Sequence, residues 1–469
     1  MPIAWSELAG LKGLDGHRVE IEGWIVPFEL EARHSYFLLA QDMACCLSCR
    51  PTDPQRCIEV FARSPIAPQA GAVRLAGTWR PLTDDPAGWR YQLRDAVLLA
   101  PASRGADKVS RRAFVAMGAA LPLGLPGLAQ AGLPWRQAAV GDDAAATRAW
   151  LDARLTVDLH SHAGHILKFS ETTSFTDVAG DMRRGGMAAA CLAVVADSPA
   201  THVLPDGRIQ AFREPEPDEL YRWSQQTFPR VNALLQRQGL TRIERAEQLS
   251  AARGAAPGVI VAAEGADFLG TKLERLDEAY RQYGLRHLQL THYRVNDLGD
   301  IQTEAPVHGG LTDFGAEVIR ACNAMGIVVD IAHGTFDLVK RAAATTVKPL
   351  ILSHTSLATR PGPRSRQITP AHARLVAETG GVIGVWPVKA IFKDLDGYAS
   401  GFARMVDAAG IDHVGLGSDM RGLTGPSLFD AYADLPRLAG ALRARGFNEE
   451  ELGKLLGGNY LRVFTQSMA

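Results

Sequence analysis

The chain has 469 residues, of which 46% are hydrophobic and 22% charged, and these proportions exclude the disordered, collagen-like and multi-span membrane classes. Fifty Lys and Arg residues against 51 Asp and Glu residues leave a net charge of -1, so we expect no nucleic-acid partner. Six cysteines are too few for a disulfide scaffold. The length suits one large barrel with a smaller domain.

Residues 1–105 are predicted to form a small β-rich domain of unknown role. Short alternating apolar runs, such as 18–26 and 72–79, are broken by Gly and Pro, a pattern typical of antiparallel strands. Cysteines cluster in this region, at Cys45, Cys46, Cys49 and Cys57. A metal or redox role for them is one option. Because no second Cys/His pair stands at zinc-site spacing, we expect ordinary structural cysteines.

Residues 106–135 have the composition of an export signal. Basic residues around Arg111 and Arg112 precede an uncharged run at 113–131, which ends in the small residues Ala129 and Ala131. The segment resembles the twin-arginine export signal of bacteria. It predicts a periplasmic or exported protein, with membrane anchoring through 113–131 as an option. A buried helix or linker is the alternative, and the protein is cytoplasmic if this internal signal is silent.

From residue 136 to 469, apolar runs alternate with amphipathic helical stretches, a pattern that predicts a parallel sheet covered on both faces. Eight repeats in this length indicate a (β/α)8 TIM barrel. An insertion after the second run, from Ala196 to about Gly258, is expected to shape a substrate pocket. The predicted strands are Leu155–His160, Ala188–Val195, Val259–Glu264, Leu285–His292, Ile327–His333, Leu350–His354, Gly381–Trp386 and His413–Asp419.

Most of these runs end in a histidine or a carboxylate. The carboxyl ends of barrel strands meet at one mouth, so residues that are distant in sequence are expected to converge there. Alternation along the first strand places His160 and His162 on one side, where both can hold the same ion. Imidazole and carboxylate together suit zinc. The residues at run ends are His160, Glu264, His292, His333, His354 and Asp419.

The pattern predicts two divalent metal ions, most simply Zn²⁺, that lie close together. Glu264 stands alone beside a glycine, and its two oxygens are suited to bridging both ions. His160 and His162 would complete one metal site. His333 and His354 would complete the other. A hydroxide bridging the two ions would then be available to attack a carbonyl carbon.

Two further residues have predicted catalytic roles. Asp419 is the candidate general base and acid, which takes a proton from the nucleophile and delivers it to a leaving amine. Its alternatives are to cap a helix or to ligate an ion. His292 is placed to hydrogen-bond the carbonyl oxygen of the substrate as negative charge develops, and a structural role is its alternative.

Residues 155–466 resemble the zinc-dependent membrane dipeptidases, also called renal dipeptidases. Several motifs match in the order found in that family, over about two-thirds of the chain. The matching motifs are Leu290-Thr-His292-Tyr-Arg-Val-Asn296, Gly310-Leu-Thr-Asp-Phe-Gly315, Met325-Gly-Ile-Val-Val-Asp330-Ile-Ala-His333, Ser353-His354-Thr-Ser356, Asp412-His-Val-Gly-Leu-Gly-Ser-Asp419 and Gly457-Gly-Asn459-Tyr-Leu-Arg462.

The resemblance implies a binuclear zinc barrel that hydrolyses dipeptides. It implies the same bridge, ligand and acid/base roles that the residue pattern suggests. It also implies that Arg366 grips the terminal carboxylate of the dipeptide, which suits the paired donors of a guanidinium group. A solvent-exposed arginine is the alternative.

Two departures from the family pattern bear on metal occupancy and substrate choice. The family's first strand carries His-x-Asp, whereas this chain has His160-Ser-His162. A neutral imidazole therefore replaces an anion, and Asp419 becomes a further candidate ligand. Met420-Arg421-Gly422 follows Asp419, where the family usually carries another acidic residue, so a cation lies near the predicted mouth.

The sequence thus predicts a metal-dependent hydrolase, a zinc metallopeptidase, that cleaves dipeptides or similar small amides. One alternative is an amidohydrolase of the same barrel class that acts on a cyclic amide or lactone. Another is a non-catalytic, membrane-tethered binding protein. The sequence leaves the oligomeric state open, with a homodimer as one option.

Overall fold

The structure is a computed structural model that describes residues 2–27, 34–41, 56–67, 71–82, 90–99, 144–166, 175–204, 207–358, 361–362 and 364–469. Its two compact units, Met1–Leu133 and Pro134–Ala469, are taken separately below. The predicted export segment at 106–135 lies outside the described residues, as do Cys45, Cys46 and Cys49.

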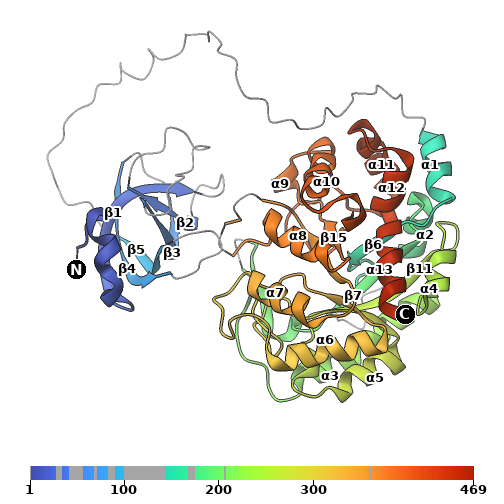
Figure 1. Ribbon diagram of the computed structural model, residues 1–469, viewed down its shortest axis with the longest axis horizontal. Helices are drawn as coiled ribbons and strands as arrows, with labels where there is room; N and C mark the ends of the chain where they lie inside the picture. The colour runs from blue at the N-terminus through green and yellow to red at the C-terminus, as the bar shows by residue number, and fades with distance from the viewer. Residues whose placement is uncertain are drawn as a thin grey trace, which may run out of the picture. The chain divides into compact units, whose positions relative to one another are not determined.

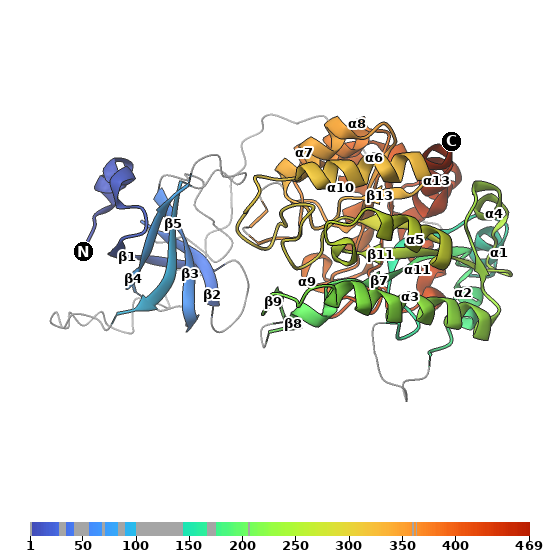
Figure 2. The same cartoon turned by 90° about the horizontal axis from the view of Figure 1, so that it is seen from below.

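The first unit is a small closed β-barrel (Figure 2). Its strands follow the order β1-β2-β3-β5-β4, and every neighbouring pair is antiparallel except β3 with β5, which is parallel. The β-rich prediction is confirmed. The parallel pair was not predicted, because strand patterning does not reveal which strands become neighbours. The elements are a 3-10 helix at Trp5–Leu14 and strands β1 (Arg18–Pro27), β2 (His34–Ala40), β3 (Cys57–Ile66), β4 (Val73–Pro81) and β5 (Tyr91–Leu98).

The core of this barrel is aromatic and aliphatic. Trp79 is fully buried and stacks on Tyr91, with ring centroids 5.4 Å apart. Phe37 and Leu93 pack in the same cluster. Cys57, the first residue of β3, is also buried.

The second unit is a barrel of eight parallel strands surrounded by helices (Figure 1). The sheet runs β11-β12-β13-β14-β15-β16-β6-β7, and the pairing of β7 with β11 closes it. This confirms the predicted (β/α)8 barrel. A short strand, β10 (Thr241–Arg242), adds to β11 from outside the ring. The barrel strands are β6 (Val157–Ser161), β7 (Ala189–Val195), β11 (Gly258–Glu264), β12 (Leu285–Gln289), β13 (Val328–Asp330), β14 (Leu350–Thr355), β15 (Val382–Val385) and β16 (Val414–Leu416).

Capping residues start several of the surrounding helices. The hydroxyls of Thr312, Thr335 and Thr369 each accept a backbone N–H from the first turn of the helix that follows. The helices are α1 (Ala144–Asp152), α2 (Val178–Gly185), α3 (Glu219–Gln238), α4 (Ala246–Ala251), α5 (Glu274–Tyr283), α6 (Asp313–Met325), α7 (Phe336–Thr345), α8 (Pro370–Glu378), α9 (Lys389–Phe392), α10 (Leu395–Ala409), α11 (Leu435–Ala444), α12 (Glu449–Gly453) and α13 (Asn459–Met468).

The predicted insertion after β7 contains a hairpin, β8 (Thr201–Val203) with β9 (Ile209–Ala211), followed by α3. None of the helices in the described parts of the chain combines the length and the apolar character that a membrane span requires.

Helix α13 closes the amino end of the barrel. Tyr460 and Phe464 pack in one cluster with inward-facing strand residues such as Leu159 and Ile260. The amide of Asn459 donates to the carbonyl oxygens of Ile411 and Val414, at 2.8 and 2.9 Å. These contacts leave the carboxyl ends of the strands as the open mouth, where the predicted site lies.

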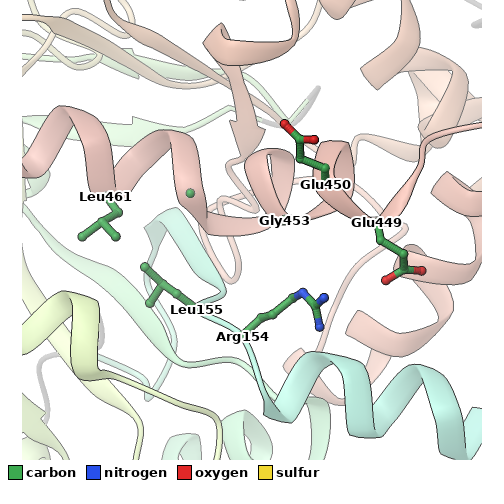
Figure 3. Close-up of a pocket in the computed structure, with 7 residues that line it drawn as sticks. Arg154, Leu155, Glu449, Glu450, Gly453 and Leu461 are labelled. Carbon is green, nitrogen blue, oxygen red and sulfur yellow. The ribbon is translucent and has the colours of Figure 1, made fainter.

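A cavity of about 430 Å³ opens at this closed end (Figure 3). None of the predicted site residues lines it, so we assign it no role in the chemistry. Its lining residues are Arg154, Leu155, Glu449, Glu450, Gly453, Gly458 and Leu461.

His372 in α8 is expected to make the second unit sensitive to acid. Burial, followed by the positive charge of Arg366, lowers the pKa of His372 to about 4 from an ordinary value of 6.5. The folded state therefore favours the neutral ring, and stability present above pH 6.5 is lost as the pH falls toward 4. The shift corresponds to about 3 kcal/mol of unfolding free energy.

We expect the His372→Leu substitution to remove this acid-dependent loss of unfolding free energy. Denaturant unfolding of metal-free protein at pH 7 and pH 4 would measure the two free energies. A variant whose pH dependence matches that of the wild type would contradict this assignment.

Candidate metal centre

Seven polar side chains gather at the carboxyl ends of the barrel strands. His160 lies in β6, Glu264 is the last residue of β11, and His354 lies in β14. The other four follow strand ends: His162 after β6, His292 after β12, His333 after β13 and Asp419 after β16. All seven are buried. Strands β12 and β13 are shorter than predicted and end at Gln289 and Asp330, so His292 and His333 lie in the connections that follow.

The Glu264 carboxylate is the centre of this cluster. Its Oε1 atom lies 3.4 Å from the Nε2 atom of His160, 3.2 Å from that of His333 and 3.5 Å from that of His354. Its Oε2 atom lies 3.2 Å from the Nε2 atoms of both His162 and His292. One carboxylate thus contacts five imidazoles from four other strands or their extensions.

The spacing of the imidazole nitrogens fits tetrahedral metal coordination. The Nε2 atoms of His160 and His162 are 3.1 Å apart, and so are those of His333 and His354. Two nitrogen ligands at about 2.0–2.1 Å from a tetrahedral zinc ion are about 3.3 Å apart. The donor set and its spacing therefore suit divalent metal.

Asp419 joins the cluster on the side of the first strand. Its Oδ1 atom lies 3.5 Å from the Nε2 atom of His162 and 4.0 Å from that of His160. These three residues form one possible metal-binding group, a second consists of His160, Glu264 and His354, and a third consists of Glu264, His292 and His333. The side chain of Asp419 can therefore reach an ion held by the first strand.

Neighbouring polar groups orient the imidazole rings. The Nδ1 atom of His162 lies 2.8 Å from the carbonyl oxygen of Ala193, to which it donates, so the Nε2 atom faces the cluster. The Nδ1 atom of His354 lies 2.9 Å from the hydroxyl of Ser353. These contacts orient both rings toward the cluster.

Burial and charge set the ionisation of the cluster. Burial alone would raise the pKa of Glu264, but the surrounding imidazoles, His292 and His160 foremost, hold it well below its usual range. Burial lowers the pKa of His333 and of His354 well below the usual value. Glu264 is therefore an anion at neutral pH, and these two rings are neutral, as metal ligands must be.

His162, which directly follows β6, behaves differently. Burial lowers the pKa of His162, but hydrogen bonds and charge from Asp419 and Glu264 together raise it to about 10. The turn after β16 makes room for this ring, since a Cβ atom at Gly422 would lie 2.6 Å from His162 Cδ2 and 2.1 Å from Asp419 Oδ1. Any side chain at position 422 would collide with the pair.

Two site residues have an uncommon backbone conformation. His333 has φ of 68° and Asp419 has φ of 48°, in the left-handed region that non-glycine residues seldom occupy. Such conformations persist only where surrounding contacts impose them, and they concentrate at functional sites.

His292 is held by a partner that sequence reasoning missed. Its Nδ1 atom lies 2.7 Å from Oδ1 of Asp197, and Oδ2 of the same carboxylate accepts the backbone N–H of Tyr293 at 3.0 Å. Asp197 comes two residues after β7, so a polar residue follows this apolar run as well. That position is the signal that could have identified it.

Arg366 faces the same cluster and is not a solvent-exposed arginine, since only 7% of it is exposed. Its Nη2 atom lies 3.0 Å from the Nε2 atom of His354, and its Nη1 group donates to Gln302 at 2.7 Å. The guanidinium carbon lies 5.4 Å from the ring centre of Trp386. Among the described atoms, Arg366 Nε is buried without a hydrogen-bond partner.

Comparison with known proteins gives a consistent picture. Residues 152–469 match the membrane dipeptidase family, peptidase family M19. Dipeptidase aclJ of Aspergillus oryzae is 32% identical over 195 residues, which cover 39% of this chain and 46% of that protein. Dipeptidase tcpJ of Claviceps purpurea is 29% identical over 220 residues, which cover 44% and 50%. The matches thus span about half the length of these relatives.

Solved structures share the fold. The probable dipeptidase PvdM from Pseudomonas aeruginosa superposes with a TM-score of 0.57 at 17% identity, covering 69% of this chain and 98% of that one. A metallopeptidase from Rhodobacter sphaeroides, solved with a phosphinate mimic of the dipeptide L-Ala-D-Ala, gives 0.55 at 21% identity, covering 67% and 99%. Because the family model matches residues 152–469, more than half of the chain, the chain belongs to the membrane dipeptidase family, peptidase family M19.

Proposed function

We propose that this protein is a metal-dependent dipeptidase that uses two divalent ions, with zinc as the expected metal. The observation that carries the proposal is the position of Glu264, whose carboxylate oxygens lie within 3.5 Å of imidazoles from both proposed ligand pairs. A bridging carboxylate between two pairs of imidazoles is the arrangement that a binuclear hydrolase requires.

The ligands divide into two groups that share Glu264. His160 and His162 would hold one ion, with Asp419 within reach of it. His333 and His354 would hold the other. When bound, the metal ions supply a water of lowered pKa as the nucleophile and polarise the scissile carbonyl.

The protein's own groups would handle the protons and the developing charge. Asp419 lies at the mouth next to His162, where its carboxylate would accept a proton from the attacking water and return it to the leaving amine. His292 would donate from Nε2 to the carbonyl oxygen as it becomes negative, while Asp197 holds the opposite ring nitrogen.

Arg366 is the proposed anchor for the free carboxylate of the dipeptide. Its guanidinium group is buried next to His354 and supported by Gln302, so it is preorganised close to the metal ligands. A paired charge-assisted contact of this kind favours a substrate with a terminal carboxylate over a neutral amide.

The test is hydrolysis of a dipeptide panel, including L,D-dipeptides, by zinc-loaded protein, with C-terminally amidated dipeptides and lactones measured in parallel. We expect free dipeptides to be cleaved and Arg366→Met to raise their KM by about 100-fold, since a charge-assisted pair is lost. The amidated substrates should respond little to the substitution.

The same panel separates the alternatives. Cleavage of lactones or cyclic amides without cleavage of dipeptides would replace the proposed activity with that of a cyclic amidohydrolase. If the purified protein binds no metal and hydrolyses none of these substrates, the result would favour a non-catalytic binding role.

A further inference from the structure

Two buried aspartates lie close to the ligand residues in sequence but outside the set that faces Glu264. Asp158 is in β6, two residues before His160, and Asp330 is in β13, three residues before His333. Both are fully buried. A buried carboxylate is costly unless its oxygens are satisfied, so what each one binds indicates why it is there.

Asp158 connects the first strand to the last. Its Oδ1 atom accepts the backbone N–H of His160 at 3.3 Å and that of Ser418 at 2.8 Å. Its Oδ2 atom accepts the hydroxyl of Ser418 at 2.5 Å and that of Tyr432 at 3.1 Å. Ser418 directly precedes Asp419, so this one carboxylate fixes the backbone on both sides of the first ligand group.

Asp330 makes the equivalent connection between β13 and β14. Its Oδ1 atom accepts the backbone N–H of Ala332 at 2.9 Å and that of Ser353 at 3.1 Å. Its Oδ2 atom lies 3.1 Å from the Nε2 atom of His287. Ala332 directly precedes His333, and Ser353 directly precedes His354.

The two aspartates therefore share one pattern. In each, a single oxygen accepts two backbone N–H groups: one two residues further along its own chain segment, and one in the neighbouring strand or directly after it. Each of these N–H groups belongs to a ligand or to the residue directly before a ligand or Asp419. Metal ligands must keep their distances to within about 0.2 Å, so backbone fixation at these points bears directly on metal affinity.

We propose that Asp158 and Asp330 are positioning residues that each hold one half of the metal centre: Asp158 the half with His160, His162 and Asp419, and Asp330 the half with His333 and His354. The inference rests on the proposed function only in that it assumes two bound ions. It adds that the two halves are supported separately, so that each can be lost without the other.

The test measures metal content, by elemental analysis of the full-length protein after dialysis against defined free zinc. We expect Asp158→Ala and Asp330→Ala each to weaken the binding of one zinc ion by about 10- to 100-fold. This is the usual loss of metal affinity when a group that supports a ligand is removed. Each variant should then hold about one ion where the wild type holds two, and the double variant should hold none. Anomalous diffraction should place the remaining ion of Asp158→Ala beside His333 and His354.

Conservative and control variants separate positioning from general stability. Asp158→Asn and Asp330→Asn keep the accepting oxygen, so we expect both to retain two ions. Asn459→Ala removes buried hydrogen bonds at the closed end of the barrel and should lower the melting temperature without selective metal loss. If an alanine variant does not fold, Asp→Thr at the same position, whose shorter side chain cannot reach both N–H groups, is measured in its place.

Two results would overturn the inference: equal loss of both ions in each single variant, or full retention in both. Either would leave the proposed function standing. A wild-type protein that binds no zinc would instead contradict the proposed function, which metal analysis of the wild type alone decides.

Discussion

Glu264→Gln is expected to empty the metal centre. The amide that replaces the carboxylate has the same shape but only one oxygen and no charge. It therefore cannot bridge two metal ions. We expect the bound zinc to fall below one ion per chain. Dipeptide hydrolysis should fall on the order of 10³-fold or more, because activation of water and of the carbonyl are lost together.

Metal analysis and steady-state kinetics on the same preparation check this result. Glu278→Gln is a suitable control, because it makes the same chemical change in helix α5, outside the barrel ring. Glu278 accepts a hydrogen bond from Tyr221 at 2.7 Å. A Glu264→Gln protein that keeps two ions would show that Glu264 is not the shared ligand.

Asp419→Asn is expected to separate proton transfer from metal binding. An asparagine at this position cannot accept a proton from water or return it to an amine, so we expect kcat for dipeptides to fall by about 10²- to 10⁴-fold. Because His160, His162 and Glu264 remain, both ions should still be present.

Metal content is the measurement that distinguishes the two roles open to Asp419. Loss of one ion together with activity would make Asp419 a ligand, as its distance of 3.5 Å from His162 permits. Asp430→Asn, an exposed aspartate in the loop that follows β16, provides the matched control.

The barrel was predictable because its signals are local. Each apolar strand and each amphipathic helix is encoded by neighbouring residues, and caps such as Thr369 precede the helix that they start. The polar residues at strand ends were found in the same way, since a parallel barrel brings all carboxyl ends to one mouth.

The contacts of the supporting residues were not predictable, because each depends on a partner far away in sequence. Asp197 meets His292 across 95 positions, and Asp158 meets Ser418 across 260. No pattern in the neighbourhood of either aspartate records these contacts. The parallel pairing of β3 with β5 in the first unit was missed for the same reason.

The barrel, its mouth and the residue types that gather there are therefore readable from the amino-acid pattern, because periodicity and strand direction act over a few residues at a time. Contacts between distant segments set the rest: which atoms of Glu264 face which imidazoles, the burial of Arg366 beside His354, and the aspartates that hold the ligand segments in place. Those distances arise when the ring of strands closes, since only closure brings the first and last strands together.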